Sequence, residues 1–277
     1  MSLRFHKMSG AGNDFILIDN FDGAMDADAG PLARRLCPRR TSVGADGLVT
    51  LEPDPKGQAD FSWRFHNADG SEAEMCGNAA RCAAWLAHQL GRAGRKLSFR
   101  TRAGLIRAEV KGNQVRVEMP GPHTIKTGLD LKVGGGGLEA GFINTGVPHV
   151  VVRVDQAEAI DLAGQGAKVR HHPDFAPAGT NANFYSLAAG GVLRMRTFER
   201  GVEAETLACG TGAVAVALMA HLKGRAAPPT RVLMSSGAEL VIDYQANPKG
   251  IDPWPGPVLM EGPVTLVYTA ELSEEVL

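Results

Sequence analysis

Two Cys-Gly steps are the residues of this sequence best suited to chemistry. They are Cys76-Gly77 and Cys209-Gly210, and each precedes a run rich in alanine. A thiol at a helix N-terminus lies beside free backbone N–H groups and the positive end of the helix dipole, which favour its thiolate form. Glycine beside the thiol lets backbone N–H groups approach a bound anion, such as a carboxylate.

The pairing of the two cysteines indicates what the chemistry would be. A thiolate on one side of a carbon and a thiol on the other can remove a proton from one face and deliver one to the opposite face. The result is an inversion of stereochemistry without a cofactor, with the substrate carboxylate held at the helix ends. A lone cysteine before a helix is more often a small core residue. Cys37 and Cys82 lack the following glycine, and we expect them to be packing residues.

The surroundings of the two steps repeat at a fixed distance. Cys209 follows Cys76 by 133 residues, and the same offset relates other identical residues. A match of this kind predicts two related units, each with a Cys-Gly step that opens a helix. The further matches are Phe65 with Phe198, Glu72 with Glu205, His88 with His221, and Gly91-Arg92-Ala93 with Gly224-Arg225-Ala226.

The helices must position these cysteines. Both runs after the Cys-Gly steps are apolar on nearly every side, so we expect each helix to be enclosed by other elements. The neighbouring segments are short and strand-like, for example 97–101 and 105–110. We therefore predict an α+β protein in which each unit is a curved sheet wrapped around a central helix. Pro120-Gly121-Pro122 marks the change of unit.

Composition limits the classes of function. A chain of 277 residues, 44% hydrophobic and 21% charged, can bury a large core and fits two domains. Its net charge of −1 gives no electrostatic reason to expect nucleic acid or an anionic membrane as a partner. The N-terminal stretch lacks the apolar run of a signal peptide, so we expect four free thiols in the cytoplasm. No Cys-x-x-Cys spacing occurs, so a zinc site is not expected.

An ordered set of motifs resembles the diaminopimelate epimerase family nearly from end to end. The matching segments are Met8 to Phe15, Phe65 to Ser71, Met75-Cys76-Gly77-Asn78, Gly179 to Phe184, Phe198-Glu199-Arg200-Gly201 and Ala208-Cys209-Gly210-Thr211-Gly212. The resemblance implies interconversion of LL- and meso-diaminopimelate, in lysine and cell-wall precursor biosynthesis, without pyridoxal phosphate or a metal. It also implies two pseudo-symmetric domains with the substrate site between them, and a C-terminal strand that returns to the first domain. The expected domains are then 1–119 with 264–277, and 120–263.

Site residues follow from the resemblance by position. Cys76 and Cys209 are the expected acid and base, and Gly77-Asn78 with Gly210-Thr211 are expected to hold the reacting carboxylate. His149 and Glu199 match residues expected to tune the thiols. The expected lining of the substrate cavity is Asn13, Asn67, Asn181, Glu199 and Arg200, which suits an amino-acid group at a second, unreacting centre.

Some of these assignments have simpler alternatives. Turn chemistry accounts for Asn13 and Asn67 without a substrate, and Glu199-Arg200 could be a surface ion pair. The sequence also departs from the family pattern in three places. Gly146-Val147-Pro148-His149 stands where many members have Gly-Asn-Pro-His, Asp46-Gly47 stands where many have Asp-Gln, and Ala79 stands where glycine is usual.

Two other functions remain possible from the sequence. One is a cofactor-independent racemase of the proline racemase type, although those usually carry His after the first Cys-Gly, where this chain has Asn78. The other is a non-catalytic binding module or a thiol redox protein, which the two separated cysteines make less favourable. The sequence is compatible with a homodimer but does not fix the oligomeric state.

Overall fold

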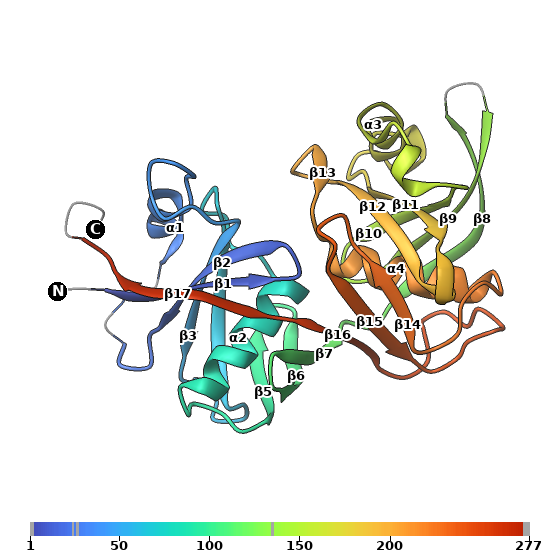
Figure 1. Cartoon of the computed structure of the whole chain (residues 1–277). Helices are drawn as coiled ribbons and strands as arrows, with labels where there is room; N and C mark the ends of the chain where they lie inside the picture. The colour runs from blue at the N-terminus through green and yellow to red at the C-terminus, as the bar shows by residue number, and fades with distance from the viewer. Residues whose placement is uncertain (1–2, 24, 26–27, 134–135, 274–277) are drawn as a thin grey trace. The chain divides into compact units, whose positions relative to one another are not determined.

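The computed structural model describes residues 3–23, 25, 28–133 and 136–273, and the chain divides into two compact units (Figure 1). Unit 1 comprises Met1–Val117 and Gly262–Leu277, and unit 2 comprises Glu118–Glu261. The chain leaves unit 1 within strand β7 (Gln114–Met119) and returns to it within strand β16 (Val258–Pro263).

Unit 1 is a mixed sheet that packs with helices α1 and α2. Its strands β1 and β2 are antiparallel, β2 and β3 parallel, β3 and β4 antiparallel, and β4 and β5 parallel. Strands β5, β6 and β7 continue antiparallel, and the C-terminal strand β17 is antiparallel to β1. The bounds are β1 Arg4–Gly10, β2 Asn13–Asp19, α1 Gly30–Leu36, β3 Gly47–Glu52, β4 Phe61–Asn67, α2 Gly77–Gln89, β5 Lys96–Thr101, β6 Gly104–Lys111 and β17 Thr265–Glu271.

Unit 2 repeats this order of pairings. Strands β9 and β10 are antiparallel, β10 and β11 parallel, β11 and β12 antiparallel, and β12 and β14 parallel. Strands β14, β15 and β16 continue antiparallel, and β8 is antiparallel to β9. The bounds are β8 His123–Val133, β9 Gly136–Asn144, β10 Pro148–Arg153, η1 Ala157–Ala159, η2 Leu162–Gly166, α3 Ala167–Arg170, η3 Pro173–Phe175, β11 Asn181–Leu187, η4 Ala189–Gly191, β12 Leu193–Glu199, β13 Ala204–Thr206, α4 Gly210–Leu222, β14 Thr230–Leu233 and β15 Glu239–Tyr244.

Helices α2 and α4 lie at the centre of their own units. Helix α2 contacts β1, β2, β3 and β6, and α4 contacts β9 to β12, β14 and β15. Ten residues of each 13-residue helix are buried, as expected for helices without a polar face. Figure 1 shows each helix against the strands of its own unit. The predicted architecture of a curved sheet around a central helix is therefore present in both units.

The two helices also end in the same way. The ring Nδ1 of His88 lies 3.2 Å from the carbonyl oxygen of Ala93, and Nδ1 of His221 lies 3.1 Å from that of Ala226. Gly91 and Gly224, with φ of 70° and 67°, follow the helices in the left-handed conformation that glycine adopts readily. The sequence repeat is thus also a repeat of hydrogen bonds.

Three strands, β8, β13 and β16, were not predicted from the sequence, and β16 follows directly after a segment rich in proline and glycine. Strand β8 has mostly exposed side chains and a mainly polar sequence, so it lacks the alternation that identifies a half-buried strand. Strand β13 has only three residues. In unit 2, β8 takes the place that the C-terminal strand β17 takes in unit 1, because each is antiparallel to the first strand of the repeated order.

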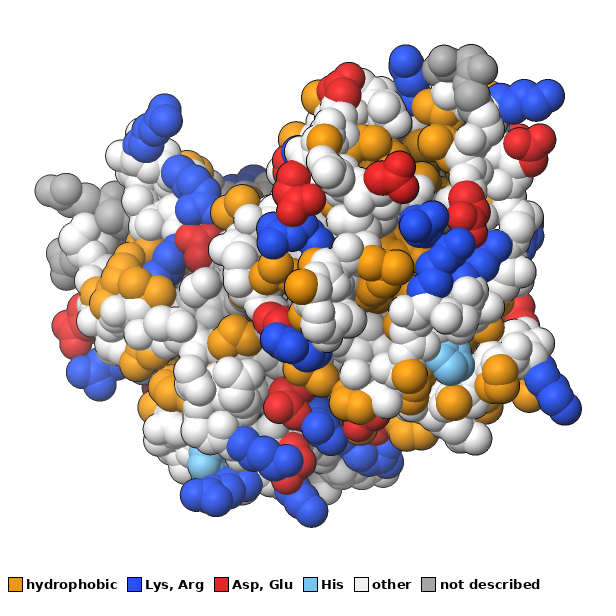
Figure 2. All heavy atoms as spheres, turned by 45° about the vertical axis from the view of Figure 1, so that its right-hand side comes forward, with side chains coloured by type: hydrophobic (Ala, Val, Ile, Leu, Met, Phe, Trp, Pro, Cys, Tyr) orange, Lys and Arg blue, Asp and Glu red, His pale blue; other side chains and the backbone are white. Residues whose placement is uncertain are grey.

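The surface and the helices give two further observations. Figure 2 shows acidic and basic side chains interspersed over the visible face rather than separated by sign, in keeping with the net charge of −1. Among the described residues, no helix is long and apolar enough to cross a membrane.

Candidate active site

The Cys76 site consists of Cys76, Gly77, Asn78 and Asn13. Cys76 is the N-cap of α2, with the extended backbone angles φ −141° and ψ 119°. It is partly exposed, whereas Gly77 and Asn78 behind it are buried. The first N–H groups of a helix have no acceptor within the helix, so the thiol stands beside backbone donors suited to an anion.

A chain of hydrogen bonds orders the amides of this site. Asn78 Nδ2 donates to Asn13 Oδ1 at 2.5 Å, and Asn13 Nδ2 donates to Asp46 Oδ2 at 2.9 Å. Arg81 Nη2 donates to Asn78 Oδ1 at 2.8 Å, and Arg39 Nη2 donates to Asp46 Oδ1 at 2.8 Å. The structure therefore brings the predicted residues Asn13 and Asn78 together. It adds Asp46 and Arg81, which sequence reasoning did not assign.

Close packing fixes where this helix begins. A Cβ atom on Gly10 would lie 2.7 Å from the carbonyl oxygen of Asn78 and 3.2 Å from Cys82 Sγ, so β1 can approach α2 only with glycine there. A Cβ atom on Gly47 would lie 2.6 Å from Cε2 of Phe65. The site therefore has no room for the glutamine expected in many relatives at position 47.

The other two cysteines of unit 1 differ from Cys76 in their environment. Burial raises the pKa of Cys82 to about 12 and the pKa of Cys37 to about 11. Both thiols therefore stay protonated at neutral pH, as suits packing residues. All four cysteines of the chain are free thiols in the structure.

Asn67, also predicted to line the substrate cavity, has its described contacts in a turn and not with Cys76, Asn78 or Asn13. It is exposed at the end of β4, and its Nδ2 donates to Ser71 Oγ at 3.0 Å. Its backbone N–H also donates to the Ser71 carbonyl oxygen at 2.9 Å. These bonds belong to the turn after β4, which is the turn chemistry that the sequence had left as an alternative.

The Cys209 site consists of Cys209, Gly210, Thr211 and His149. Cys209 is the N-cap of α4, with φ −133° and ψ 101°, and only 7% of its surface is exposed. Its Sγ lies 3.6 Å from Thr211 Oγ1. Thr145 Oγ1 donates to the Thr211 carbonyl oxygen at 2.9 Å. Because Thr145 directly follows β9, this bond connects the end of β9 to the first turn of α4.

His149 is fully buried and its neutral form is favoured. Burial, together with the charge of Arg200, lowers the pKa of His149 to about 3, against the opposing effect of the Asn183 hydrogen bond. Asn183 Nδ2 donates to the Val150 carbonyl oxygen at 2.8 Å, and Asn183 Oδ1 accepts from Thr197 Oγ1 at 3.0 Å. The amide orientation that follows makes His149 Nδ1, 3.1 Å from Asn183 Nδ2, an acceptor. The imidazole proton is then on Nε2, for which the described residues offer no hydrogen-bond partner.

Asn181 and Arg200 lie together beside this histidine. Asn181 Oδ1 accepts from the backbone N–H of Arg200 at 2.9 Å, and Asn181 Nδ2 donates to the Pro148 carbonyl oxygen at 3.0 Å. Glu199 is the last residue of β12, so it directly precedes Arg200. The structure thus places His149, Asn181 and Arg200 near one another. It adds Asn183, whose motif was recognised but whose role was not assigned.

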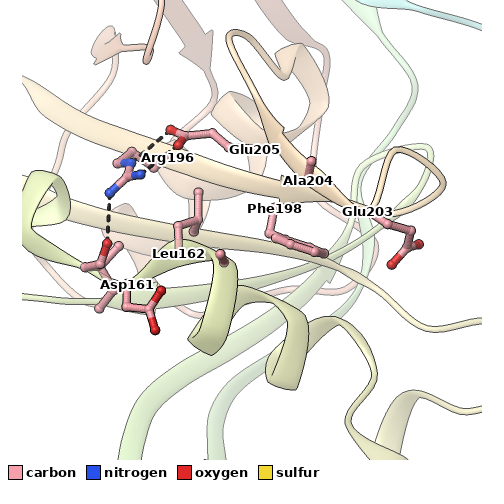
Figure 3. A pocket seen from close by; sticks show the side chains of 9 residues that line it. Asp161, Leu162, Arg196, Phe198, Glu203, Ala204 and Glu205 are labelled. Carbon is pink, nitrogen blue, oxygen red and sulfur yellow. Dashed lines mark hydrogen bonds and ion pairs between the residues drawn. The ribbon is translucent and has the colours of Figure 1, made fainter.

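A separate cavity in unit 2 involves other residues. It measures about 370 Å³ and lies between η2 and strands β12 and β13 (Figure 3). Arg196, on its wall, forms a 2.7 Å ion pair with Glu205 and donates to the Ile160 carbonyl oxygen at 3.0 Å. Its lining contains none of the site residues predicted from the sequence, and we assign it no ligand.

The matching family model and the similar proteins of known function point to the same family. Residues 5–125 and 141–267 match the family model described as diaminopimelate epimerase. The diaminopimelate epimerase of Aquifex aeolicus is 41% identical over 285 residues, with 99% of each chain covered. That of Chlorobaculum tepidum is 40% identical, with 96% of this chain and all of the relative covered.

Solved structures with little sequence identity share the fold. A phenazine biosynthesis protein of the PhzF family from Bacillus anthracis has a TM-score of 0.73 at 14% identity, with 99% of both chains covered. A hydroxyproline epimerase from Agrobacterium vitis, with bound trans-4-OH-L-proline, has a TM-score of 0.71 at 16% identity, and 99% and 93% of the chains are covered. At this identity the likeness describes the fold alone.

Proposed function

Because this chain belongs to the diaminopimelate epimerase family, an isomerase family, we propose that Cys76 and Cys209 are the two proton carriers of its reaction. The family resemblance drawn from the sequence motifs is thereby confirmed, and so is the fold class. The observation that supports the proposal best is that both cysteines cap buried helices at matched positions of repeated units. Its substrate would be LL-2,6-diaminopimelate, and its product the meso isomer used for lysine and cell-wall precursors.

The proposed reaction moves one proton off a carbon and another onto it. The thiolate of one cysteine takes the α-proton and becomes a thiol, and the electron pair left on the carbon is delocalised into the adjacent carboxylate. The thiol of the other cysteine then gives its proton to the opposite face and becomes a thiolate. The backbone N–H groups around Gly77-Asn78 and Gly210-Thr211 stabilise the carboxylate while its negative charge grows.

The second amino-acid group of the substrate needs its own partners. We assign its carboxylate to the Arg200 guanidinium, its ammonium to the Glu199 carboxylate, and the remaining polar contacts to the amides of Asn13, Asn67 and Asn181. The Asn181 amide already fixes the backbone of Arg200, which supports this grouping.

We also propose that His149 acts on the thiols as a neutral group. Its depressed pKa keeps the ring uncharged at neutral pH, and its Nε2–H can donate a hydrogen bond without adding a positive charge. Glu199 would supply negative charge near the same site. We further propose that the enzyme is located in the cytoplasm and forms a homodimer.

Solvent deuterium incorporation tests the mechanism directly. Diaminopimelate, as the LL and as the meso isomer, is incubated in D₂O with the native enzyme, with Cys76→Ala and with Cys209→Ala, and proline serves as a comparison substrate. Each substitution should abolish epimerisation, because inversion needs a proton carrier on both faces, and proline should not exchange. Cys37→Ala is the matched control, since it removes a protonated packing thiol. Full turnover in either single variant of the pair would rule out the two-base mechanism.

A further inference from the structure

Arg81 is a fully buried arginine in the helix that Cys76 begins. Its side chain is 0% exposed and turns back toward the first turn of α2. Nη2 donates to Asn78 Oδ1 at 2.8 Å, and Nη1 donates to the Gly77 carbonyl oxygen at 3.4 Å. A buried cation is costly unless its charge is compensated nearby, so its surroundings indicate where negative charge is favoured.

The thiols of Cys76 and Cys82 interact electrostatically with the charge of Arg81. Burial lowers the pKa of Arg81 to about 10, and the negative forms of Cys82 and Cys76 oppose that shift. Arg81 therefore remains charged at neutral pH. Cys82, with a pKa raised by burial to about 12, remains protonated. Of the two thiols, Cys76 is thus the one that can supply negative charge, and because Coulomb coupling is mutual, Arg81 must favour the Cys76 thiolate.

Most other charged side chains on the strands packed against α2 form ion pairs with a side chain of opposite charge. Lys7 of β1 and Asp14 of β2 form an ion pair at 2.7 Å. Arg39 bonds both Asp14 and Asp46, the two carboxylates near Asn13. On the same four strands, Asp19 pairs with Arg92, Glu52 with Arg64 of β4, and Glu109 with Lys111. The other ionisable side chains there are the exposed Arg4 and Arg107 and the buried His6.

The second unit has no equivalent cation at the matched position. The offset of 133 residues takes Arg81 to Val214, which is also fully buried. The charged residues assigned to the Cys209 site, Glu199 and Arg200, have opposite signs, and His149 is neutral. The environments of the two thiols are therefore electrostatically unequal although their backbones match.

We propose that Arg81 is a positioning residue that stabilises the thiolate of Cys76, so that the resting enzyme carries its thiolate at Cys76 rather than at Cys209. The inference rests on the proposed function in taking these two thiols as the proton carriers. It implies that the free enzyme is ready to remove a proton at Cys76 and to deliver one from Cys209.

The pH profile of alkylation measures this directly. Iodoacetamide reacts with thiolates, and mass spectrometry of the peptides gives the rate at each cysteine between pH 5.5 and 9.5. In the native enzyme, Cys76 should reach half its maximal rate at lower pH than Cys209 and below the ordinary thiol value of about 8.5. Arg81→Met should slow alkylation of Cys76 at pH 7 by at least about tenfold and leave Cys209 unchanged.

Two further variants separate charge from other effects. Arg81→Gln keeps a hydrogen-bond donor for Asn78 Oδ1 but loses the charge, so it should behave like Arg81→Met. A native profile in Arg81→Gln would assign the effect to hydrogen bonding and overturn the proposal. Arg92→Met removes an arginine that lies beyond the C-terminal end of α2 and should leave both profiles unchanged.

The buried thiols report on folding within the same experiment. Cys37 and Cys82 should stay unreactive in every folded variant. If both Arg81 variants unfold, the native profile decides, and a half-maximal pH at Cys76 at or above that of Cys209 overturns the proposal. The assay uses no substrate, so this inference can fail while Cys76→Ala still abolishes epimerisation, which would leave the two-base mechanism standing.

Discussion

Cys76 and Cys209 share a backbone conformation, but different side chains surround them. Both are extended N-caps of central helices. Beside the first lie a buried arginine and an amide chain that reaches Asp46. Beside the second lies the hydroxyl of Thr211, and Asn183 packs against Gly212 and bonds the neutral His149. The repeat thus places the two cysteines in unequal surroundings, which under the proposed mechanism makes one thiol the base and the other the acid at a single α-carbon.

Arg200→Lys tests whether the substrate has a second carboxylate. Lysine keeps the positive charge but loses the planar fork that binds a carboxylate through two hydrogen bonds. Loss of such a bond costs about 1.5–3 kcal/mol, so kcat/KM for diaminopimelate should fall roughly tenfold to a hundredfold. Arg231→Lys, at an exposed ion pair with Glu239, is the control and should keep full activity. Unchanged kcat/KM in folded Arg200→Lys would remove the guanidinium from the substrate contacts.

His149 should make the enzyme less stable as the pH falls below neutral. Its pKa is about 3 in the folded protein and about 6.5 in an unfolded chain. Between these values the unfolded state binds a proton that the folded state does not, so the free energy of unfolding falls with decreasing pH. The expected slope is up to about 1.4 kcal/mol per pH unit.

His149→Gln isolates this contribution. Glutamine can accept the Asn183 hydrogen bond but does not titrate, so the variant should lose less stability than the native enzyme between pH 6.5 and pH 5. Urea unfolding at several pH values measures the difference between the two slopes. Parallel slopes would show that His149 is not the neutral buried group that its environment indicates.

At the scale of elements, the first turns of α2 and α4 are held by close contacts rather than by side-chain caps. Gly212 is the clearest case: a Cβ atom there would lie 2.5 Å from Asn183 Oδ1 and 3.1 Å from Cys209 Sγ. The matched position in α2 is Ala79, which is fully buried and accommodated. The units therefore differ in how tightly the strands approach the first turn of the central helix.

Gly212→Ala should destabilise the enzyme although alanine favours helices. The helix propensity of alanine would add about 1 kcal/mol of stability. The added methyl group, however, meets an amide that Thr197 and Val150 hold in place, and such overpacking costs about 1–3 kcal/mol. The urea midpoint and the epimerase rate should both fall. Ala79→Gly is the matched change and should lose about 1 kcal/mol with its activity kept. A Gly212→Ala enzyme more stable than the native one would contradict the close contact.

Much of this arrangement could be predicted from the sequence, and the limits have physical causes. The two central helices were recognisable because nearly every residue around Ala83 and Ala217 is small or apolar. Strand β8 was missed because pairing with β9 holds it, whereas its exposed side chains carry no alternation. Asp46 and Asn183 were missed because a hydrogen bond between residues distant in the chain leaves no local pattern. Arg81 looked like an ordinary helix residue, since its burial depends on the strands around it.

At the scale of the whole molecule, the repeat explains the return of the chain to unit 1. Each unit needs one further strand antiparallel to its first strand, and β8 supplies it in unit 2. In unit 1, β17 takes this place, because it is antiparallel to β1. Phe5 and Tyr268 lie edge to face at 5.9 Å across that pair. Strand β17 is therefore part of the first unit.

The exposed apolar residues of β17 should form the contact of a homodimer. Leu266, Val267 and Tyr268 are 39%, 54% and 43% exposed, so three consecutive residues of β17 present apolar surface. An exposed apolar strand is a surface for pairing with another strand. We therefore expect a second copy of the chain as the partner, since a two-fold axis places the same strand opposite itself.

Val267→Lys should then convert the dimer to a monomer, because it places a charge in the contact without removing packing within the protomer. Sedimentation velocity at low micromolar concentration gives the mass of each species. Val202→Lys is the matched control: Val202 is 56% exposed in unit 2, and this change should leave the dimer intact. The contact through β17 would be refuted by a monomeric native enzyme, and equally by a Val267→Lys enzyme that remains a dimer.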